Sequence, residues 1–161
     1  MDQRGFRVAS VSQVEFAELL KTRCWLESIA LREAVERGSL AWEESVVLAN
    51  YRLSRYPRFE SKDPFIANHD WEVAHKYFHM TIIAECGSSF MLKFCEQLYD
   101  QNIRYRQISV RKAYPARDVT AEHNAICDAI LARDGHKAAN LLVAHYQNTG
   151  SFVLKQLAAS S

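Results

Sequence analysis

Glycine and proline are scarce in this chain, which has only 5 glycines and 3 prolines among 161 residues. A fold of many short strands needs many tight turns, so this scarcity argues against an all-β protein. An excess of one charge is also missing: the formal net charge is +1, and no overall field favours nucleic acid or an anionic membrane. No apolar run approaches a membrane span, and the first residues lack a signal-peptide core. We therefore expect a cytoplasmic helical protein with no membrane partner.

The four cysteines form no metal-binding or redox motif. Cys24, Cys86, Cys95 and Cys127 include no C-x-x-C pair, and each lies in an apolar helical context. We interpret them as buried, reduced thiols rather than as a disulfide framework. The chain also lacks a Gly-rich phosphate loop, a G-x-S-x-G elbow and an obvious Cys/His nucleophile pair, and the missing H-E-x-x-H helix argues against a zincin protease.

Apolar residues recur at helical spacing along most of the chain, which is long enough for one domain with a substantial core. This spacing, with Gly and Pro at the breaks, predicts helices at residues 14–36, 41–56, 70–86, 89–112, 119–133 and 135–157. Residues 5–10 are predicted to form a short strand or arm. The expected fold is all-α, a single antiparallel bundle of about six to seven helices.

Four histidines lie on the apolar faces of three of these helices. His75 and His79 are four residues apart and share one face of the third helix. His123 and His145 lie eleven residues on either side of Asp134, so a turn there places them at the same height on antiparallel neighbours. A buried imidazole needs partners for two ring nitrogens, and one divalent cation can satisfy a nitrogen of all four. The sequence therefore predicts a metal site at His75, His79, His123 and His145.

Each histidine also has a plainer interpretation as a hydrogen-bonded core residue, which is the commoner fate of a lone His on an apolar face. The second, mirror-related pair favours the metal over that interpretation. His69 and His136 fall near helix starts, where we expect them to be solvated. Residues 72–75 form a Glu-x-x-His of the di-iron type, but a second copy is missing.

A metal inside a bundle can leave a coordination position open, and a small carboxylate can fill it while pairing with arginine. We predict effector-binding roles for Arg23, Arg104, Tyr105 and Arg106. Arg23 neighbours the apolar stripe of the first helix, one turn from Glu27. Arg104 and Arg106 point to opposite sides of their helix, so at most one should face the pocket. The alternative for each arginine is a solvated or ion-paired surface residue.

The order and spacing of several motifs resemble the FCD domain, the all-α effector-binding domain of the FadR branch of GntR-type bacterial transcription regulators. The resemblance runs from Gly5 to about Leu154. The motifs are Arg23-x-x-Leu26-Glu27, Phe78-His79 with Cys86-Gly87-Ser88, Glu122-His123-x-x-Ile126, Ala129-Ile130-x-Ala132-x-Asp134, and His145. More narrowly, the chain is similar to carbon-starvation-type repressors that respond to glutarate, in His75-Lys76-x-Phe78-His79, Cys86-Gly87-Ser88 and Arg104-Tyr105-Arg106.

The resemblance implies a ligand set. Metal-binding members use an aspartate or asparagine, a histidine four residues later, and two histidines on the last two helices. These positions fall on His75, His79, His123 and His145, and His75 departs from the pattern because an acidic or amide ligand is usual there. The family commonly binds zinc or nickel at a site that doubles as a pocket for small organic acids. The expected cofactor is thus zinc or nickel, and the expected effector is a small carboxylate, with a dicarboxylate such as glutarate among the candidates.

The resemblance also implies a sensor and dimerisation module rather than an enzyme. Residues 1–12 resemble the last strand and linker of the winged helix-turn-helix that precedes this domain, and residues 13–161 resemble the effector-binding bundle. We expect a homodimer that contacts DNA only through a winged-helix domain absent from this sequence. The competing hypothesis is a helical-bundle, metal-dependent hydrolase with Glu72 or Glu122 as general base. A third hypothesis is a purely structural metal.

Overall fold

The structure is a computed structural model that describes residues 12–60, 66–109 and 117–159. The described residues form six helices: α1 (Gln13–Arg37), α2 (Leu40–Ser54), α3 (His69–Ile82), α4 (Ser89–Ser109), α5 (Val119–Leu131) and α6 (Gly135–Ala158). The all-α prediction is therefore confirmed. The predicted strand at 5–10 lies outside the described residues, as does nearly all of the segment 1–12.

Short polar side chains begin several helices. Ser12, Ser39 and Asp134 precede α1, α2 and α6, and their side-chain oxygens accept hydrogen bonds from backbone N–H groups of the first turn. Arg133 adopts a left-handed conformation, with φ 56°, just after α5. That conformation turns the chain sharply, so α6 begins soon after α5 ends. The spacing of His123 and His145 predicted a turn at this place.

The third helix is shorter than predicted, because it ends at Ile82 rather than at Cys86. Ala84 and Cys86 donate backbone hydrogen bonds to the carbonyl oxygens three residues earlier, so the chain leaves the α-helical pattern in a tighter turn. Gly87, with φ 77°, completes that turn in a conformation that favours glycine. The early end leaves His75 and His79 in the regular part of α3.

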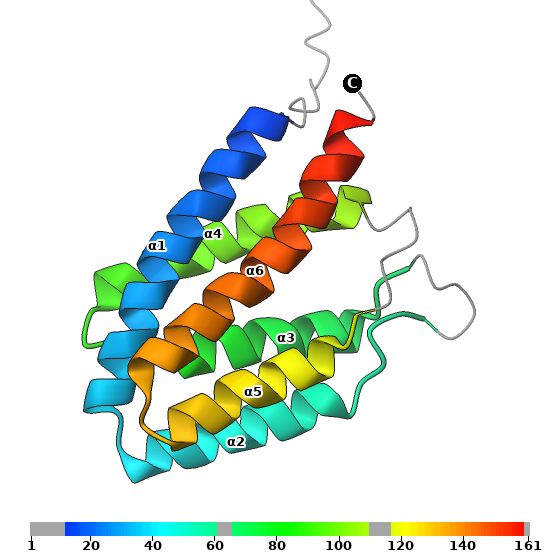
Figure 1. Cartoon of the computed structure of the whole chain (residues 1–161). Helices are drawn as coiled ribbons and strands as arrows, with labels where there is room; N and C mark the ends of the chain where they lie inside the picture. The colour runs from blue at the N-terminus through cyan, green and yellow to red at the C-terminus, as the bar shows by residue number, and fades with distance from the viewer. Residues whose placement is uncertain (1–11, 61–65, 110–116, 160–161) are drawn as a thin grey trace, which may run out of the picture.

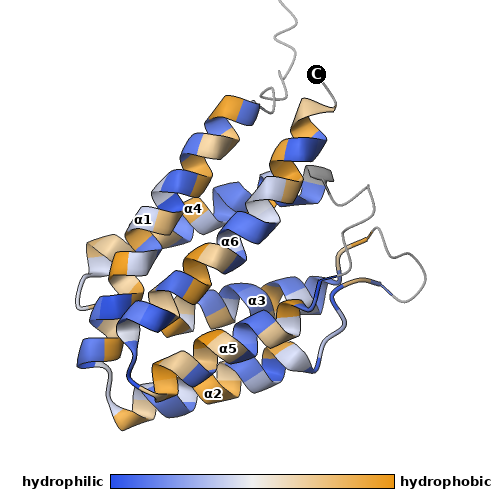
Figure 2. Cartoon of the chain, in the orientation of Figure 1, coloured by the Kyte–Doolittle hydropathy of each residue, from blue (hydrophilic) through white to orange (hydrophobic). Residues whose placement is uncertain are grey.

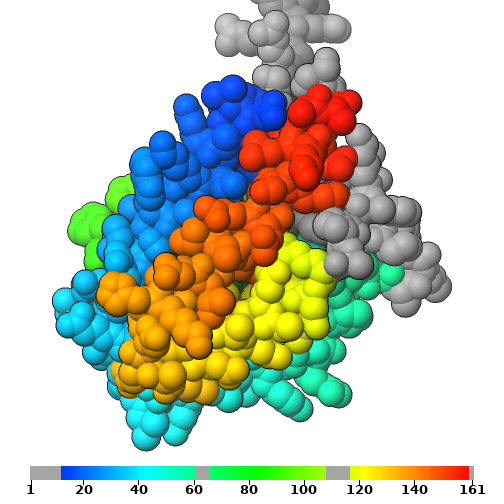
Figure 3. Space-filling model, viewed as in Figure 1, coloured from blue at the N-terminus to red at the C-terminus, as the bar shows by residue number. Residues whose placement is uncertain are grey.

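The described helices pack into one bundle, in which each helix contacts at least two others. α1 packs most extensively against α6, and the start of α1 lies at the same end of the bundle as the end of α6 (Figure 1). α2 packs on α3 and α5, while α4 crosses behind α1 and α6 (Figure 1). Each helix carries both hydrophilic and hydrophobic residues (Figure 2), which is the pattern of helices that bury one face. Side chains of α6 fill the space between α1 and α5 (Figure 3).

The cysteines are unbonded, as predicted: Cys86, Cys95 and Cys127 are buried, and Cys24 is half-buried. Among the described residues, no helix combines the length and the apolar character needed to cross a bilayer.

Cys95 is expected to make the stability of the fold sensitive to alkaline pH. Burial raises the pKa of its thiol from 9.0 to about 12, and the Glu27 carboxylate adds to the shift. Because the pKa is raised in the folded state, the stabilisation is complete below pH 9 and is lost as the pH rises towards 12. Above pH 9, the free energy of unfolding of the wild type should fall faster than that of Cys95→Ala, by up to about 1.4 kcal/mol per pH unit. Urea denaturation between pH 8 and 11 checks this, and parallel pH profiles would contradict it.

Candidate metal and effector site

Four histidine side chains from three helices converge in the interior. His75 and His79 come from α3, His123 from α5 and His145 from α6, and none is more than 5% exposed. One ring nitrogen of each lies within 4.8 Å of the corresponding nitrogen of the other three. The ring centroids of His123 and His145 are 4.7 Å apart. The structure thus brings together the four residues that the spacing singled out.

A carboxylate fixes the orientation of the His145 ring. Its Nδ1 lies 2.7 Å from Oε2 of Glu122, and an ionised carboxylate only accepts, so Nδ1 carries the proton and Nε2 keeps its lone pair. Arg117 holds Glu122 in turn, with Nε 2.6 Å from Oε1, and it also donates to Thr149. Partial burial raises the pKa of Glu122, but the hydrogen bonds from Arg117 and His145 outweigh it and lower the pKa from 4.5 to about 2. Glu122 is therefore an ionised acceptor at neutral pH.

A second carboxylate orients His79 through a tyrosine. The Tyr146 hydroxyl donates to Glu27 and lies 3.0 Å from Nδ1 of His79. Since the hydroxyl proton goes to Glu27, His79 donates its Nδ1 proton to the tyrosine oxygen and keeps a lone pair on Nε2. Glu27 also accepts from Nε of Arg23 at 2.7 Å, and the Arg23 guanidinium lies 4.1 Å from the centroid of the Tyr146 ring. Two carboxylates, on α1 and α5, thus set the tautomers of two rings.

His75 has a different set of partners. Its Nε2 lies 3.0 Å from Nε2 of His79, and because His79 offers a lone pair there, the shared proton belongs to His75. Nδ1 of His75 then accepts from the Tyr99 hydroxyl at 2.5 Å, with Nη1 of Arg106 at 3.4 Å. The indole of Trp71 stacks on the His75 ring, with centroids 4.4 Å apart. To bind a cation through Nε2, His75 must first move its proton, so it is the least prepared of the four.

His123 supplies the clearest test of whether a metal fits. Its Nε2 is buried and has no hydrogen-bond partner among the described residues. Leaving such a group unsatisfied costs about 1–3 kcal/mol. Burial lowers the pKa of all four imidazoles, so the rings are neutral and each has a lone pair to offer. This donor set suits zinc or nickel, and a cation held by the rings would satisfy the orphaned nitrogen.

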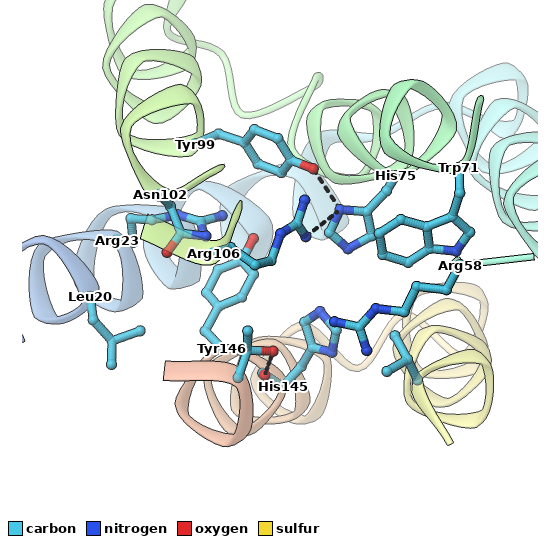
Figure 4. A pocket seen from close by; sticks show the side chains of 12 residues that line it. Leu20, Arg23, Arg58, Trp71, His75, Tyr99, Asn102, Arg106, His145 and Tyr146 are labelled. Atoms are coloured by element: carbon cyan, nitrogen blue, oxygen red, sulfur yellow. Dashed lines mark hydrogen bonds between the residues drawn. The ribbon is translucent and has the colours of Figure 1, made fainter. Parts of the chain in front are cut away.

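A small pocket lies beside the rings (Figure 4). Three arginines line it, Arg23, Arg58 and Arg106, and none of its described lining residues is acidic. The space inside it that can hold the centre of a water molecule is about 20 Å³, which is room for about one water. Arg106 lies in the middle of the pocket and points towards His75 (Figure 4).

Two of the four predicted effector-binding residues lie at this pocket. Arg23 and Arg106 line it and are buried, whereas Arg104 is exposed and Tyr105 is half-buried, and neither lines it. Neighbouring residues on a helix point about 100° apart, so Arg104 and Tyr105 turn away when Arg106 faces inward. The residues that α4 presents to the pocket are Tyr99, Asn102 and Arg106.

The carboxylates that a hydrolase would use as a base are already paired. Glu72 accepts from Arg106, and Glu122 accepts from Arg117 and His145. An ionised arginine pairs with each carboxylate and holds it in a structural role, so the arrangement of these described residues does not favour the hydrolase hypothesis.

Several residues of the site were not identified from the sequence. Arg58 follows Pro57 in the connection between α2 and α3, and its guanidinium lies 5.3 Å from the centroid of the Trp71 ring. A loop residue has no periodicity that would reveal it. Tyr99 and Asn102 did carry a signal, because they lie seven and four residues before Arg106, and this spacing places all three on one helix face. Tyr146, next to His145 in the chain, gave no such signal.

The comparisons with known proteins agree with this architecture. The FCD domain family model matches residues 18–148. The chain is 38% identical over 151 residues to the uncharacterized HTH-type transcriptional regulator BphR of Paraburkholderia xenovorans (strain LB400). This match covers 94% of the present chain and 62% of BphR. It is 31% identical over 149 residues to the HTH-type transcriptional repressor GlaR of Escherichia coli (strain K12), and this match covers 90% of the present chain and 67% of GlaR. The chain thus spans roughly two thirds of the length of these relatives.

Solved structures show the same fold. A GntR family transcriptional regulator from Pseudomonas syringae pv. tomato str. DC3000 superposes with a TM-score of 0.74 at 14% identity, over 94% of this chain and 61% of that one. The metal-free FCD domain of TM0439 superposes with a TM-score of 0.68 at 17% identity, over 94% and 99%. The family match and the two relatives together show that the chain belongs to the FCD-domain family of GntR-type transcription regulators.

Proposed function

We propose that this chain senses a small carboxylic acid through a divalent cation held by His75, His79, His123 and His145. The observation that carries the proposal is the convergence of four buried ring nitrogens within 4.8 Å. Zinc and nickel both accept imidazole ligands. Four neutral ligands leave the full charge of the cation uncompensated, so the bound metal would supply a strong electrostatic attraction for a carboxylate.

Arg23 and Arg106 are proposed to pair with the acid, because hydrogen bonds between guanidinium and carboxylate are among the stronger polar contacts in proteins. The pocket has room for about one water, so an organic acid enters only if side chains or helices move. Arg106, which occupies the middle of the pocket in Figure 4, is the first side chain that must shift. Binding of the acid therefore changes the packing around α3 and α4.

In a regulator, this change in packing would alter DNA binding. The names of the relatives, HTH-type regulators, support this role, and the proposal includes a homodimer whose winged-helix domains contact DNA. The acid can shift the DNA-bound state only by its difference in affinity between the two arrangements, typically about 1–3 kcal/mol.

Calorimetry with metal-loaded protein tests the proposal. We expect saturable binding of at least one mono- or dicarboxylate of three to six carbons to the zinc- or nickel-loaded protein, and binding at least about tenfold weaker after chelation of the metal. Mass spectrometry of the ligand should show no product. Equal binding with and without metal would contradict the sensing mechanism. Turnover would support the hydrolase, and failure of every acid to bind would support a structural metal.

Glu122→Gln is expected to weaken metal binding by about 10- to 100-fold, the usual effect of losing a group that orients a ligand histidine. The glutamine side chain has an NH2 group in place of one carboxylate oxygen of Glu122. That NH2 group then faces an N–H donor of Arg117 or of His145, so one of these hydrogen bonds is lost. Competition with a fluorescent chelator measures the affinity for zinc. Asp128→Asn makes the same chemical change at an exposed position of α5 and should leave the affinity unchanged. Equal affinities for the two variants would show that Glu122 does not orient His145 for the metal.

A further inference from the structure

Two buried polar side chains, Asn102 and Arg23, line the α1–α4 side of the pocket. Asn102 is 8% exposed and presents its side chain to the pocket from α4. Arg23 is 2% exposed, and although its Nε bonds to Glu27, its Nη2 is buried without a partner in the described part of the chain. Both side chains line the same pocket, and Figure 4 shows them on the side away from Trp71 and Arg58.

A buried polar atom without a partner, such as Nη2 of Arg23 among the described residues, is rare in folded proteins. A buried donor or acceptor without a partner costs about 1–3 kcal/mol, and the great majority of buried polar groups are satisfied. The unpartnered Nη2 of Arg23, in a pocket that the Asn102 amide also lines, therefore points to a ligand that bonds to it. The Asn102 amide nitrogen and Nη2 of Arg23 both donate hydrogen bonds, so the matching ligand group is an oxygen acceptor, such as a carboxylate or a carbonyl.

The pocket has a second polar region at the imidazoles. His75 and His145 line it on the side of α3 and α6, and Leu20 adds an apolar wall. A ligand that spans the pocket would place one end near the imidazoles and the other near Asn102 and Arg23. The two ends therefore meet different chemistry: a metal-binding set at one, and hydrogen-bond donors at the other.

We infer that Asn102, with Nη2 of Arg23, forms a second subsite that binds an oxygen-bearing group at the far end of the acid. This inference rests on the proposed function, in which the first carboxylate binds at the metal. Asn102 is then a specificity-determining residue: it favours acids that carry a terminal carboxylate or carbonyl over acids that end in an alkyl group. A hydrophobic chain end would leave both donors buried and unpaired, and binding sites built from polar groups reject such ligands for that reason.

Three five-carbon acids that differ at the far end of the chain test this preference when they are titrated into the zinc-loaded protein by calorimetry. Glutarate ends in a carboxylate, 4-oxopentanoate carries a carbonyl near its end, and valerate ends in a methyl group. We expect the wild type to bind glutarate, 4-oxopentanoate or both more tightly than valerate. Asn102→Leu, which keeps the approximate volume but removes the amide, should weaken the preferred acid by about 10- to 100-fold and leave valerate within about twofold. Asn102→Ala should lose the preference over valerate in the same way. This second variant shows that the loss does not come from poor packing of the leucine side chain.

Asn140→Leu makes the same substitution at an exposed position of α6 and should bind all three acids as the wild type does. An unchanged preference in both Asn102 variants would overturn the inference, and so would an equal loss for valerate and for the preferred acid, which would mark Asn102 as merely structural. Either result would leave the proposed function intact. If the zinc-loaded wild type binds none of these three acids, the subsite inference is overturned, and the proposed function fails only if every mono- and dicarboxylate of three to six carbons also fails to bind.

Discussion

His123→Ala is expected to abolish tight zinc binding, with a loss of affinity of more than about 100-fold. Loss of a residue that merely orients a ligand costs about 10- to 100-fold, and His123 is proposed to be a ligand itself. Its Nε2 is the buried ring nitrogen without a partner in the described residues, so a cation is the group that would satisfy it. Elemental analysis of protein that has been loaded with zinc and then dialysed measures the effect.

The same variant should lose the thermal stabilisation that zinc provides. At a free zinc concentration 100 times the dissociation constant, a ligand that binds only the folded state stabilises it by about 2.7 kcal/mol. For a domain of this size that corresponds to an increase in Tm of roughly 5–10 °C. His136→Ala, at an exposed position near the start of α6, should keep the full increase. An equal increase in Tm for His123→Ala and the wild type would show that zinc binds elsewhere.

Glu27→Ala is expected to destabilise the fold by about 3–5 kcal/mol, because it leaves the buried charge of Arg23 without its partner. Both residues are 2% exposed, and Glu27 also accepts from the Tyr146 hydroxyl. Urea denaturation of the metal-free protein measures the change without any contribution from the metal site.

A matched control for this variant lies on the same helix. Glu33 pairs with Arg37 at the same spacing of four residues, but both side chains are well exposed, and surface pairs contribute at most about 1 kcal/mol. Glu33→Ala should therefore change stability little. The double variant Arg23→Met/Glu27→Leu removes both charges and should be at least about 2 kcal/mol more stable than Glu27→Ala. Similar losses for Glu27→Ala and Glu33→Ala would contradict the buried-pair account.

The helices were largely predictable because their signals are local. Apolar spacing, and glycine or proline at the breaks between helices, depend on neighbouring residues alone. The early end of α3 was not predictable, because Cys86 continues the apolar spacing of α3 while the backbone has already turned. A pattern of side chains shows which face is buried, but it does not show where the backbone hydrogen bonds change.

The four histidines could be grouped from the sequence because they share helix faces and a turn. The tyrosine and glutamate partners of these histidines could not be assigned, because each partner lies on a different helix from the histidine that it contacts. Glu27 reaches His79 through Tyr146, and Glu27 and Tyr146 are 119 positions apart in the chain. Arg58 enters the pocket from a loop, which carries no repeat. Arg106 could be separated from Arg104 only by the rotation of α4 about its axis, and tertiary packing sets that rotation.

Anomalous diffraction from crystals of the zinc-loaded protein, collected on both sides of the zinc absorption edge, tests the central claim most directly. We predict a single strong peak among the rings of His75, His79, His123 and His145, within bonding distance of a nitrogen of at least three of them. A strong peak at any other place in the chain, with the four rings still hydrogen-bonded to one another and to their present partners, would contradict the claim.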